Sequence, residues 1–163
     1  MNCTNCGAPL TPIQGRDYLA CQFCSTFHFP KPLERSADGV IPLGQRADAE
    51  CPVCGIALSH GSIERCDALY CEQCRGLLLD GEDFSRVVGR RRAKRTGPCD
   101  EPRPLNPEEL QRIVNCPVCH RRMDVHPYYG PGNVVVDSCA PCRLIWLDHG
   151  EIGAIERAPG RTA

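Results

Sequence analysis

The sequence predicts three small β-hairpin modules joined by linkers, and three observations support this. Six Cys-x-x-Cys pairs fall into three consecutive couples, in which 14, 16 and 19 residues separate the two pairs. Only 35 of the 163 residues are Leu, Ile, Val or Phe, whereas Gly and Pro together contribute 30. The third couple and the residues after it repeat the second. One continuous core is therefore not expected, because small domains this poor in apolar residues usually need a metal or disulfides.

The spacing of the cysteines is that of four-cysteine metal sites. Two cysteines separated by two residues can offer both sulfurs to one ion, and a hairpin brings the second pair round to complete a tetrahedron. Zn²⁺ suits four thiolates and makes no redox demand. We therefore predict three zinc ions, one for each couple. The expected ligands are Cys3, Cys6, Cys21 and Cys24; Cys51, Cys54, Cys71 and Cys74; and Cys116, Cys119, Cys139 and Cys142.

A disulfide-rich secreted protein is the first alternative, since 14 of the residues are cysteine. However, the chain does not begin with a basic segment followed by an apolar run, and no stretch approaches the roughly 18 apolar residues of a membrane span. We therefore expect a cytoplasmic protein, in which this spacing indicates metal. Rubredoxin-like iron or thiol redox chemistry is a weaker alternative, because every pair has a partner pair at the spacing of a metal site.

The formal net charge is −1 at pH 7 when the thiols are counted as neutral. Twelve thiolates and three Zn²⁺ ions would add −6 and make it −7. An acidic molecule has no general attraction to nucleic acid, so such binding would depend on a local basic segment.

The first module covers residues 1–32, with a short strand leading to Cys21 and a closing strand that ends at Pro30. Residues 33–49 form a polar linker, in which the apolar residues from 40 to 43 offer one short strand.

The second module covers residues 50–95. After its last cysteine an apolar strand leads to Asp80, which is the expected N-cap of a helix with an acidic residue three positions on. Apolar residues at 84, 87 and 88 give that helix one buried face. The helix either ends before Gly89 or continues through Arg92.

Residues 96–112 form a second linker, and Asn106 followed by proline predicts a short helix within it. The third module covers residues 113–160. Asp148 is the expected N-cap of its helix, and Trp146 is expected to pack in the small core between the hairpin and that helix.

The second and third modules both approximate a longer pattern: Cys-Pro-x-Cys, a hairpin, then Cys-x-x-Cys-x-Gly-x-Trp-Leu-Asp-x-Gly-Glu. The third carries Cys116-Pro117-Val118-Cys119, Cys139-Ala140-Pro141-Cys142 and Ile145-Trp146-Leu147-Asp148-His149-Gly150-Glu151, with Leu144 in place of the glycine. The second departs further, with Leu78 at the tryptophan position. These motifs resemble the transcription factor IIB-type zinc ribbon of small, mostly uncharacterised bacterial proteins. The resemblance covers about half the chain and implies a zinc-ribbon fold and a link to transcription.

Two features could contact a partner. The first is a concentrated basic segment, which could bind phosphates or could be a solvated helix end that complements the helix dipole. The second is a loop with Tyr128 and Tyr129 beside a Gly-Pro-Gly tip, which could stack on a partner or cover its own hairpin. The basic segment consists of Arg86, Arg90, Arg91, Arg92, Lys94 and Arg95.

Two cysteines remain outside the couples: Cys66 is expected to be a small buried residue, and Cys99 an exposed free thiol. The five histidines are not expected to bind metal, because four thiolates already close each site. The same closure argues against hydrolytic catalysis, which requires an open position on the metal.

These patterns together predict a zinc-binding, non-enzymatic adaptor whose partner is a protein. The alternative is a nucleic-acid-binding module that uses residues 86–95 and the tyrosine loop. We expect neither membrane association nor a small-molecule substrate.

Overall fold

The computed structural model describes the whole chain except residues 4–6, 15–18, 24–26, 29–37, 129–131 and 161–163. It divides into two compact units, Met1–Ser36 and Ala37–Ala163. The first unit is a small antiparallel sheet with the strand order β1-β2-β3. Its strands are β1 (Thr11–Pro12), β2 (Leu19–Ala20) and β3 (Phe27–His28).

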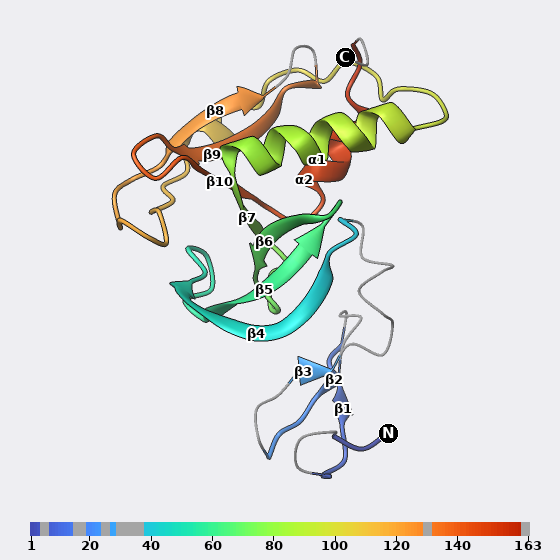
Figure 1. Ribbon diagram of the computed structural model, residues 1–163, viewed down its shortest axis with the longest axis vertical. Coiled ribbons are helices and arrows are strands. Elements are labelled where there is room, and N and C mark those ends of the chain that lie inside the picture. Colours follow the sequence, from blue (N-terminus) through green and yellow to red (C-terminus); the bar gives the residue numbers. More distant parts are fainter. Residues whose placement is uncertain (4–6, 15–18, 24–26, 29–37, 129–131, 161–163) are drawn as a thin grey trace. The chain divides into compact units, whose positions relative to one another are not determined.

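The second unit is a seven-stranded sheet with the order β4-β5-β6-β7-β10-β9-β8, in which every pair of neighbours is antiparallel (Figure 1). Its first four strands are β4 (Ile41–Glu50), β5 (Ala57–Ile63), β6 (Cys66–Tyr70) and β7 (Leu77–Asp80). The others are β8 (Asp124–Tyr128), β9 (Val134–Cys139) and β10 (Leu144–Leu147). The helices are α1 (Gly81–Lys94) and α2 (Glu151–Arg157), with a 3₁₀ turn, η2 (Glu109–Gln111), between them.

The second and third modules, called here the second and third repeats, are joined through the β7–β10 pair. Leu78 and Trp146 stand at equivalent places in the two repeats, four residues after the last cysteine, and they are each other's partner in the pair. The neighbouring pairs are Leu77 with Leu147 and Leu79 with Ile145. If each repeat is superposed on the other, the first of these pairs falls on the second. The two repeats are therefore related by a pseudo-twofold axis and share one sheet, where the sequence predicted separate modules.

Strand β4 is much longer than the short strand expected in the 33–49 linker. It spans ten residues, and most of them are exposed because β4 is an edge strand. Its pairing with β5 shifts register twice, and Gly44 adopts a left-handed φ of 76° between the register points at Pro42 and Arg46. Such an irregular, one-sided strand has no alternation of apolar residues that a sequence pattern could reveal.

Helix α1 begins after Asp80, whose carboxylate accepts a hydrogen bond from the backbone N–H of Glu82 at 2.8 Å. The expected N-cap is therefore confirmed. The helix does not end at Gly89 but continues to Lys94, and it buries Phe84, Val87, Val88 and Arg92. It packs on β6, β7 and β10, and α2 packs on β9 and on α1 (Figure 1). Among the described residues, no helix has the length and apolar content needed to cross a membrane.

Helix α2 has only seven residues, too few to be stable on its own, and distant side chains hold both of its ends. At the N-terminus, Asp38 accepts a hydrogen bond from the backbone N–H of Gly150 at 3.0 Å. At the C-terminus, the Arg92 guanidinium donates to the carbonyls of Ile155 at 2.6 Å and Ala158 at 3.1 Å. These contacts satisfy groups that a helix leaves unpaired and place a cation at the negative end of its dipole.

Two expected helix starts differ from the prediction. Asp148 does not cap α2 with its carboxylate, which instead accepts a hydrogen bond from Trp146 Nε1 at 3.1 Å and pairs with Arg112. Only the reciprocal contact of a capping box is present, from the Asp148 backbone N–H to the Glu151 carboxylate at 2.8 Å. In the 96–112 linker, Asn106 does cap the backbone N–H of Glu108 at 3.0 Å, but the turn that follows is the short 3₁₀ turn η2.

Candidate metal centres

The second unit contains two groups of four cysteines whose Sγ atoms all lie within 4.8 Å of one another. The shortest contacts are Cys51–Cys74 at 3.6 Å and Cys119–Cys139 at 3.5 Å. A tetrahedral site with metal–sulfur bonds of about 2.3 Å has sulfur–sulfur edges of about 3.8 Å, so both groups fit one ion. The first group is Cys51, Cys54, Cys71 and Cys74, and the second is Cys116, Cys119, Cys139 and Cys142. Eight of the twelve predicted ligands are thus brought together in two sites.

Each site is built from two knuckles, the tight turns that contain a Cys-x-x-Cys pair. In three of the four knuckles of these sites the first cysteine makes the same two backbone hydrogen bonds, as Cys51 does with Ile56 at 2.7 Å and Gly55 at 2.9 Å. The residue after the second cysteine has a left-handed φ in all four, including the non-glycine residues Arg75, His120 and Arg143. Backbone N–H groups also point at sulfur, as from Cys54 to Cys51 at 3.3 Å and from Cys74 to Cys71 at 3.4 Å. Such donors stabilise thiolate ligands.

The thiols of each group cannot all ionise without a cation. Hydrogen bonds from the Cys71 and Cys74 side chains lower the pKa of Cys51 to about 2. In the same group, the bond to Cys51 raises the pKa of Cys71 to about 11, and bonds to Cys51 and Cys71 raise the pKa of Cys74. Hydrogen bonds within the group thus favour the ionised form of one sulfur and the protonated form of its neighbours. A bound divalent cation would replace those shared protons, because metal binding requires deprotonated ligands.

In the second group, too, the pKa of one thiol is lowered and the pKa of another is raised. The backbone N–H of Arg121 is the main cause that lowers the pKa of Cys119 to about 7, whereas the bond to Cys119 raises the pKa of Cys142 to about 12. Both groups thus have the donor chemistry of a metal–thiolate site.

One buried cluster contains cysteines from both groups, together with Leu58, Leu78, Met123 and Trp146. Trp146 is fully buried, as expected, but it packs against the other repeat as well as its own. A Cβ atom on Gly76 would lie 2.2 Å from Trp146 Cζ2, so the indole ring occupies the space that a side chain at residue 76 would need. The two cysteine groups therefore share one core.

The first unit has only part of the predicted third site within the described residues. Cys3 and Cys21 are buried, whereas Cys6 and Cys24 lie outside the described residues. The knuckle at Cys3 repeats the hydrogen bonds of the other knuckles, to Ala8 at 2.8 Å and from Gly7 at 2.8 Å. The local backbone therefore suits a knuckle, and the third ion stays a prediction.

Among the described residues, no histidine belongs to a group that could hold a metal. His126 contacts Ser138 Oγ at 2.9 Å, and His149 contacts Asp38 at 3.0 Å. Asp38 is 2% exposed, and it also accepts a hydrogen bond from Arg91 through its backbone carbonyl. Sequence reasoning missed Asp38, because an isolated acid in a polar linker carries no local signal of a contact 111 residues away.

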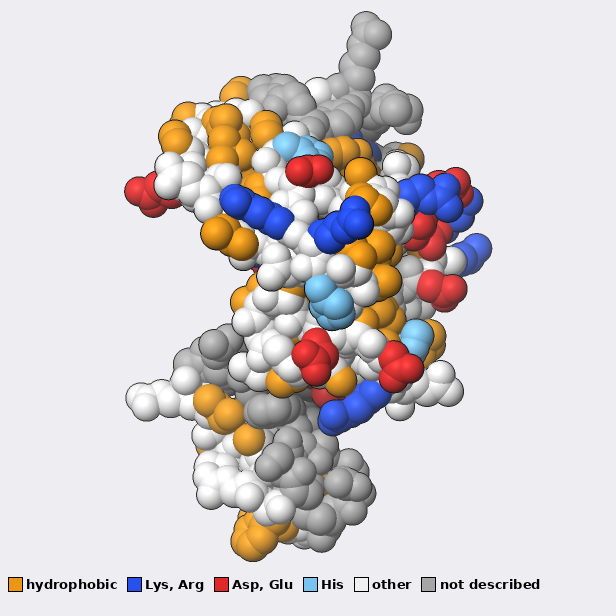
Figure 2. All heavy atoms as spheres, turned by 90° about the vertical axis from the view of Figure 1, so that its left-hand side faces the viewer, with side chains coloured by type: hydrophobic (Ala, Val, Ile, Leu, Met, Phe, Trp, Pro, Cys, Tyr) orange, Lys and Arg blue, Asp and Glu red, His pale blue; other side chains and the backbone are white. Residues whose placement is uncertain are grey.

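All six residues of the predicted basic segment have partners within the chain. Three of them pair with acidic side chains: Arg86 with Glu82 and Asp83, Arg91 with Glu156, and Lys94 with Glu64. The other three donate to backbone carbonyls: Arg90 at residue 64, Arg92 at the end of α2, and Arg95 at residues 97 and 98. On the face drawn in Figure 2, Lys and Arg side chains lie singly or beside Asp and Glu and do not form one broad basic surface.

The predicted tyrosine loop lies partly within the described residues. Tyr128 is half-buried in β8, and its ring packs edge-on against Phe84 of α1 with the centroids 4.9 Å apart. Tyr129 lies outside the described residues. Cys66 is buried and Cys99 is exposed, as expected. Burial raises the pKa of the Cys66 thiol.

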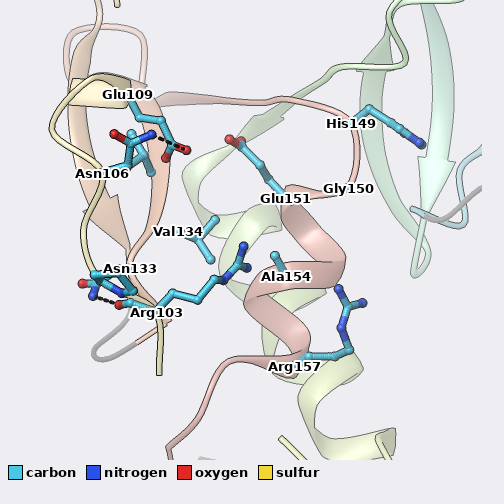
Figure 3. A pocket seen from close by; sticks show the side chains of 12 residues that line it. Arg103, Asn106, Glu109, Asn133, Val134, His149, Gly150, Glu151, Ala154 and Arg157 are labelled. Carbon is cyan, nitrogen blue, oxygen red and sulfur yellow. Dashed lines mark hydrogen bonds between the residues drawn. The ribbon is translucent and has the colours of Figure 1, made fainter. Parts of the chain in front are cut away.

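A hollow of about 530 Å³ lies between the 103–109 segment, the start of β9 and α2 (Figure 3). Arg103 reaches between Val134 and Ala154, whereas the ring of His149 points away from the hollow (Figure 3). Several of its polar groups bond to other parts of the chain, as Arg157 does to Asp100 at 3.3 Å. The hollow is therefore a seam where the linker meets α2.

Comparison with protein-family models, curated proteins and solved structures found no match. The likeness to the transcription factor IIB-type ribbon thus rests on the quoted motifs, and the metal centres rest on their geometry.

Proposed function

We propose that the chain is a non-enzymatic, zinc-stabilised adaptor that binds a protein partner in a process linked to transcription. The observation that carries the proposal is the pair of four-cysteine groups, each of which offers four sulfurs to one ion. Four thiolates complete a tetrahedral zinc site and leave no position for substrate or activated water. In this proposal the metal has a structural role, and a third ion binds Cys3, Cys6, Cys21 and Cys24 in the first unit.

The exposed surface suits a protein partner. Val53 and Val118 occupy equivalent positions at the tips of two knuckles, and they are 55% and 57% exposed. Apolar side chains held on rigid turns lose little conformational entropy when a partner covers them. The basic segment and Tyr128 support the alternative of nucleic-acid binding less well, because their side chains already make contacts within the chain.

Metal content and coordination test the structural role. Native mass spectrometry with elemental analysis should find three zinc ions per reduced chain. Replacement by Co²⁺ should give the visible absorption of tetrahedral thiolate coordination, and added cyanide should leave that spectrum unchanged if each site is closed. Bound iron, or a cobalt spectrum that shifts with cyanide, would contradict the proposal.

The adaptor role has a separate test. Affinity purification after nuclease treatment should retain a stoichiometric protein partner, and a Val53→Asp/Val118→Asp variant with normal metal content should lose it. If the partner is lost on nuclease treatment alone, the contact is through nucleic acid.

A further inference from the structure

We propose that the knuckles of the third repeat bind the phosphates of single-stranded nucleic acid through Arg121 and Arg122, with Arg143 as a third contact. This site differs from the basic segment 86–95, and it goes beyond the proposed protein-binding role. It depends on the second unit being folded, not on the identity of a protein partner.

The three arginines lie beside one cysteine group. Arg121 closes the first knuckle, since its carbonyl accepts a hydrogen bond from the Cys116 backbone N–H at 2.8 Å. Arg122 forms an isolated β-bridge with Asn115, at the other end of the same knuckle. Arg143 directly follows Cys142, whose Sγ lies within 4.8 Å of the sulfurs of the first knuckle. The two knuckles of a single cysteine group thus carry or adjoin three arginine residues.

These side chains are available to a ligand. Arg121, Arg122 and Arg143 are all exposed. Within the described part of the chain, none of their guanidinium groups makes a hydrogen bond or ion pair, although Asp124 lies only two residues from Arg122. This contrasts with residues 86–95, where every basic side chain has an internal partner.

The second repeat shows that the fold does not need these charges. At the places of Arg121 and Arg122 it has Ile56 and Ala57, and its other knuckle carries Glu72 where the third repeat has Ala140. The second repeat brings four cysteines together with Arg75, the equivalent of Arg143, and has no counterpart of the other two arginines. Two additional cations are therefore not required to offset the charge of a metal–thiolate centre. The excess charge of the third repeat therefore points to an anionic ligand.

Arginine favours phosphate as that ligand, because its planar fork can donate two parallel hydrogen bonds to phosphate oxygens. The knuckles present short turns and no helix or long ribbon to enter a major groove, so a flexible single strand fits them better than a duplex. Because the rest of the molecule is acidic, the binding should be weak and strongly dependent on salt.

Fluorescence anisotropy with the full, zinc-loaded chain tests the site, using labelled single-stranded DNA and RNA of about 20 nucleotides. Arg121→Gln/Arg122→Gln should weaken binding about tenfold at low salt. It should also reduce the slope of log K against log salt concentration by about 1.4, at about 0.7 per lost phosphate contact. The matched control is Arg46→Gln/Arg65→Gln, which removes two exposed arginines on the side of the second repeat and should leave both quantities unchanged.

Metal content and circular dichroism should be identical in the two variants, and the single substitutions Arg121→Gln and Arg122→Gln serve if the double variant folds poorly. The proposal would be overturned if the wild-type chain did not bind, or if the control variant lost as much affinity as Arg121→Gln/Arg122→Gln. It would also be overturned if poly-L-glutamate competed as strongly as unlabelled nucleic acid. The relative affinities for DNA and RNA distinguish the two sources of phosphate.

Discussion

The second and third repeats follow the same path of knuckle, hairpin, knuckle, strand and helix, but they differ where they meet. The second repeat has Gly76 and Leu78 at positions where the third has Leu144 and Trp146. The indole ring of Trp146 lies over Gly76, so a large side chain of one repeat fills the space left by the missing side chain of the other. The two halves have thus become complementary instead of identical, and each now depends on its partner for a complete core.

The helices show a second difference. Helix α1 has 14 residues and a side-chain N-cap from its own repeat, whereas α2 has seven and takes its end contacts from Asp38 and Arg92. The third repeat is therefore the more dependent half. Four predictions test this dependence.

The largest effect is expected from loss of one metal ligand. Cys71→Ser should lose one ion and unfold both repeats, because the β7–β10 pair and the shared cluster join them. Binding of a structural zinc ion contributes on the order of 10 kcal/mol, more than a domain of this size can spare. Hydrogen exchange measured by mass spectrometry should show loss of protection in β8, β9 and β10 as well as in β5, β6 and β7.

Cys66→Ser is the matched control for this loss, since Cys66 is a buried cysteine of β6 outside the metal group. It should keep the metal content and lower stability by no more than about 1–3 kcal/mol. Persistent protection of β8–β10 in Cys71→Ser would show that the repeats are independent.

The next effect concerns the fit between Gly76 and Trp146. Gly76→Ala should lower the free energy of unfolding by about 1–3 kcal/mol, because its methyl group would overlap the indole ring. Gly89→Ala, at an exposed position in α1 where a Cβ meets nothing within 4 Å, should instead raise it by about 0.5–1 kcal/mol. Chemical denaturation measures both.

Replacing the indole should relieve the clash, so Gly76→Ala should cost less in a Trp146→Leu background than in the wild type. Equal costs in the two backgrounds would mean that the indole does not exclude a side chain at residue 76.

An effect of similar size, but concentrated in α2, is expected from the contact between α1 and α2. Arg92→Met should lower stability by about 1–3 kcal/mol, because the carbonyls at the end of α2 lose a buried donor. In this variant, the protection of backbone amides from hydrogen exchange should fall in α2 before it falls in other elements. Arg86→Gln removes an exposed arginine of the same helix and should change stability by less than about 1 kcal/mol. An equally small effect of Arg92→Met would show that α2 does not depend on this contact.

The last prediction is a pH dependence of stability that arises from Glu151. Burial raises the pKa of this carboxyl from 4.5 to about 8, so the native state holds its proton more tightly than the unfolded chain does. The contribution of this group to the free energy of unfolding is therefore complete at a pH below the pKa that the carboxyl has in the unfolded chain. It is lost as the pH rises through about 8. Glu151→Gln, which can still accept the Asp148 N–H, should remove this loss.

Urea denaturation of the metal-loaded protein at about pH 6 and about pH 9 measures the difference in stability. The wild type should lose more stability over this range than Glu151→Gln. Glu101→Gln, at an exposed position, should behave as the wild type. Parallel pH profiles for all three proteins would exclude Glu151 as the source.

The sequence was a good guide to local features and a poor one to contacts between repeats. Cysteine spacing predicted both described four-cysteine groups because the geometry of a knuckle is fixed within a few residues. The Asp80 cap was likewise a local signal. The β7–β10 pair was not predicted, because the sequence of two apolar segments of four residues does not indicate which strand each of them will pair with. The expected capping by Asp148 was wrong because its carboxylate forms contacts with Trp146 and Arg112 that outweigh the local pattern.

The β7–β10 pair also has a consequence for the ancestry of the fold. A single repeat cut from this sheet would expose the backbone edge and apolar side chains of one central strand, and a second copy is the natural partner for that edge. Duplication and fusion of a homodimer would give a pseudo-twofold axis of this kind, with both copies on one chain. A homodimer must carry every substitution twice, whereas a fused pair can place a glycine on one side and a tryptophan on the other. On a single chain, the third repeat can therefore carry both the tryptophan and the extra arginines while the second repeat carries neither.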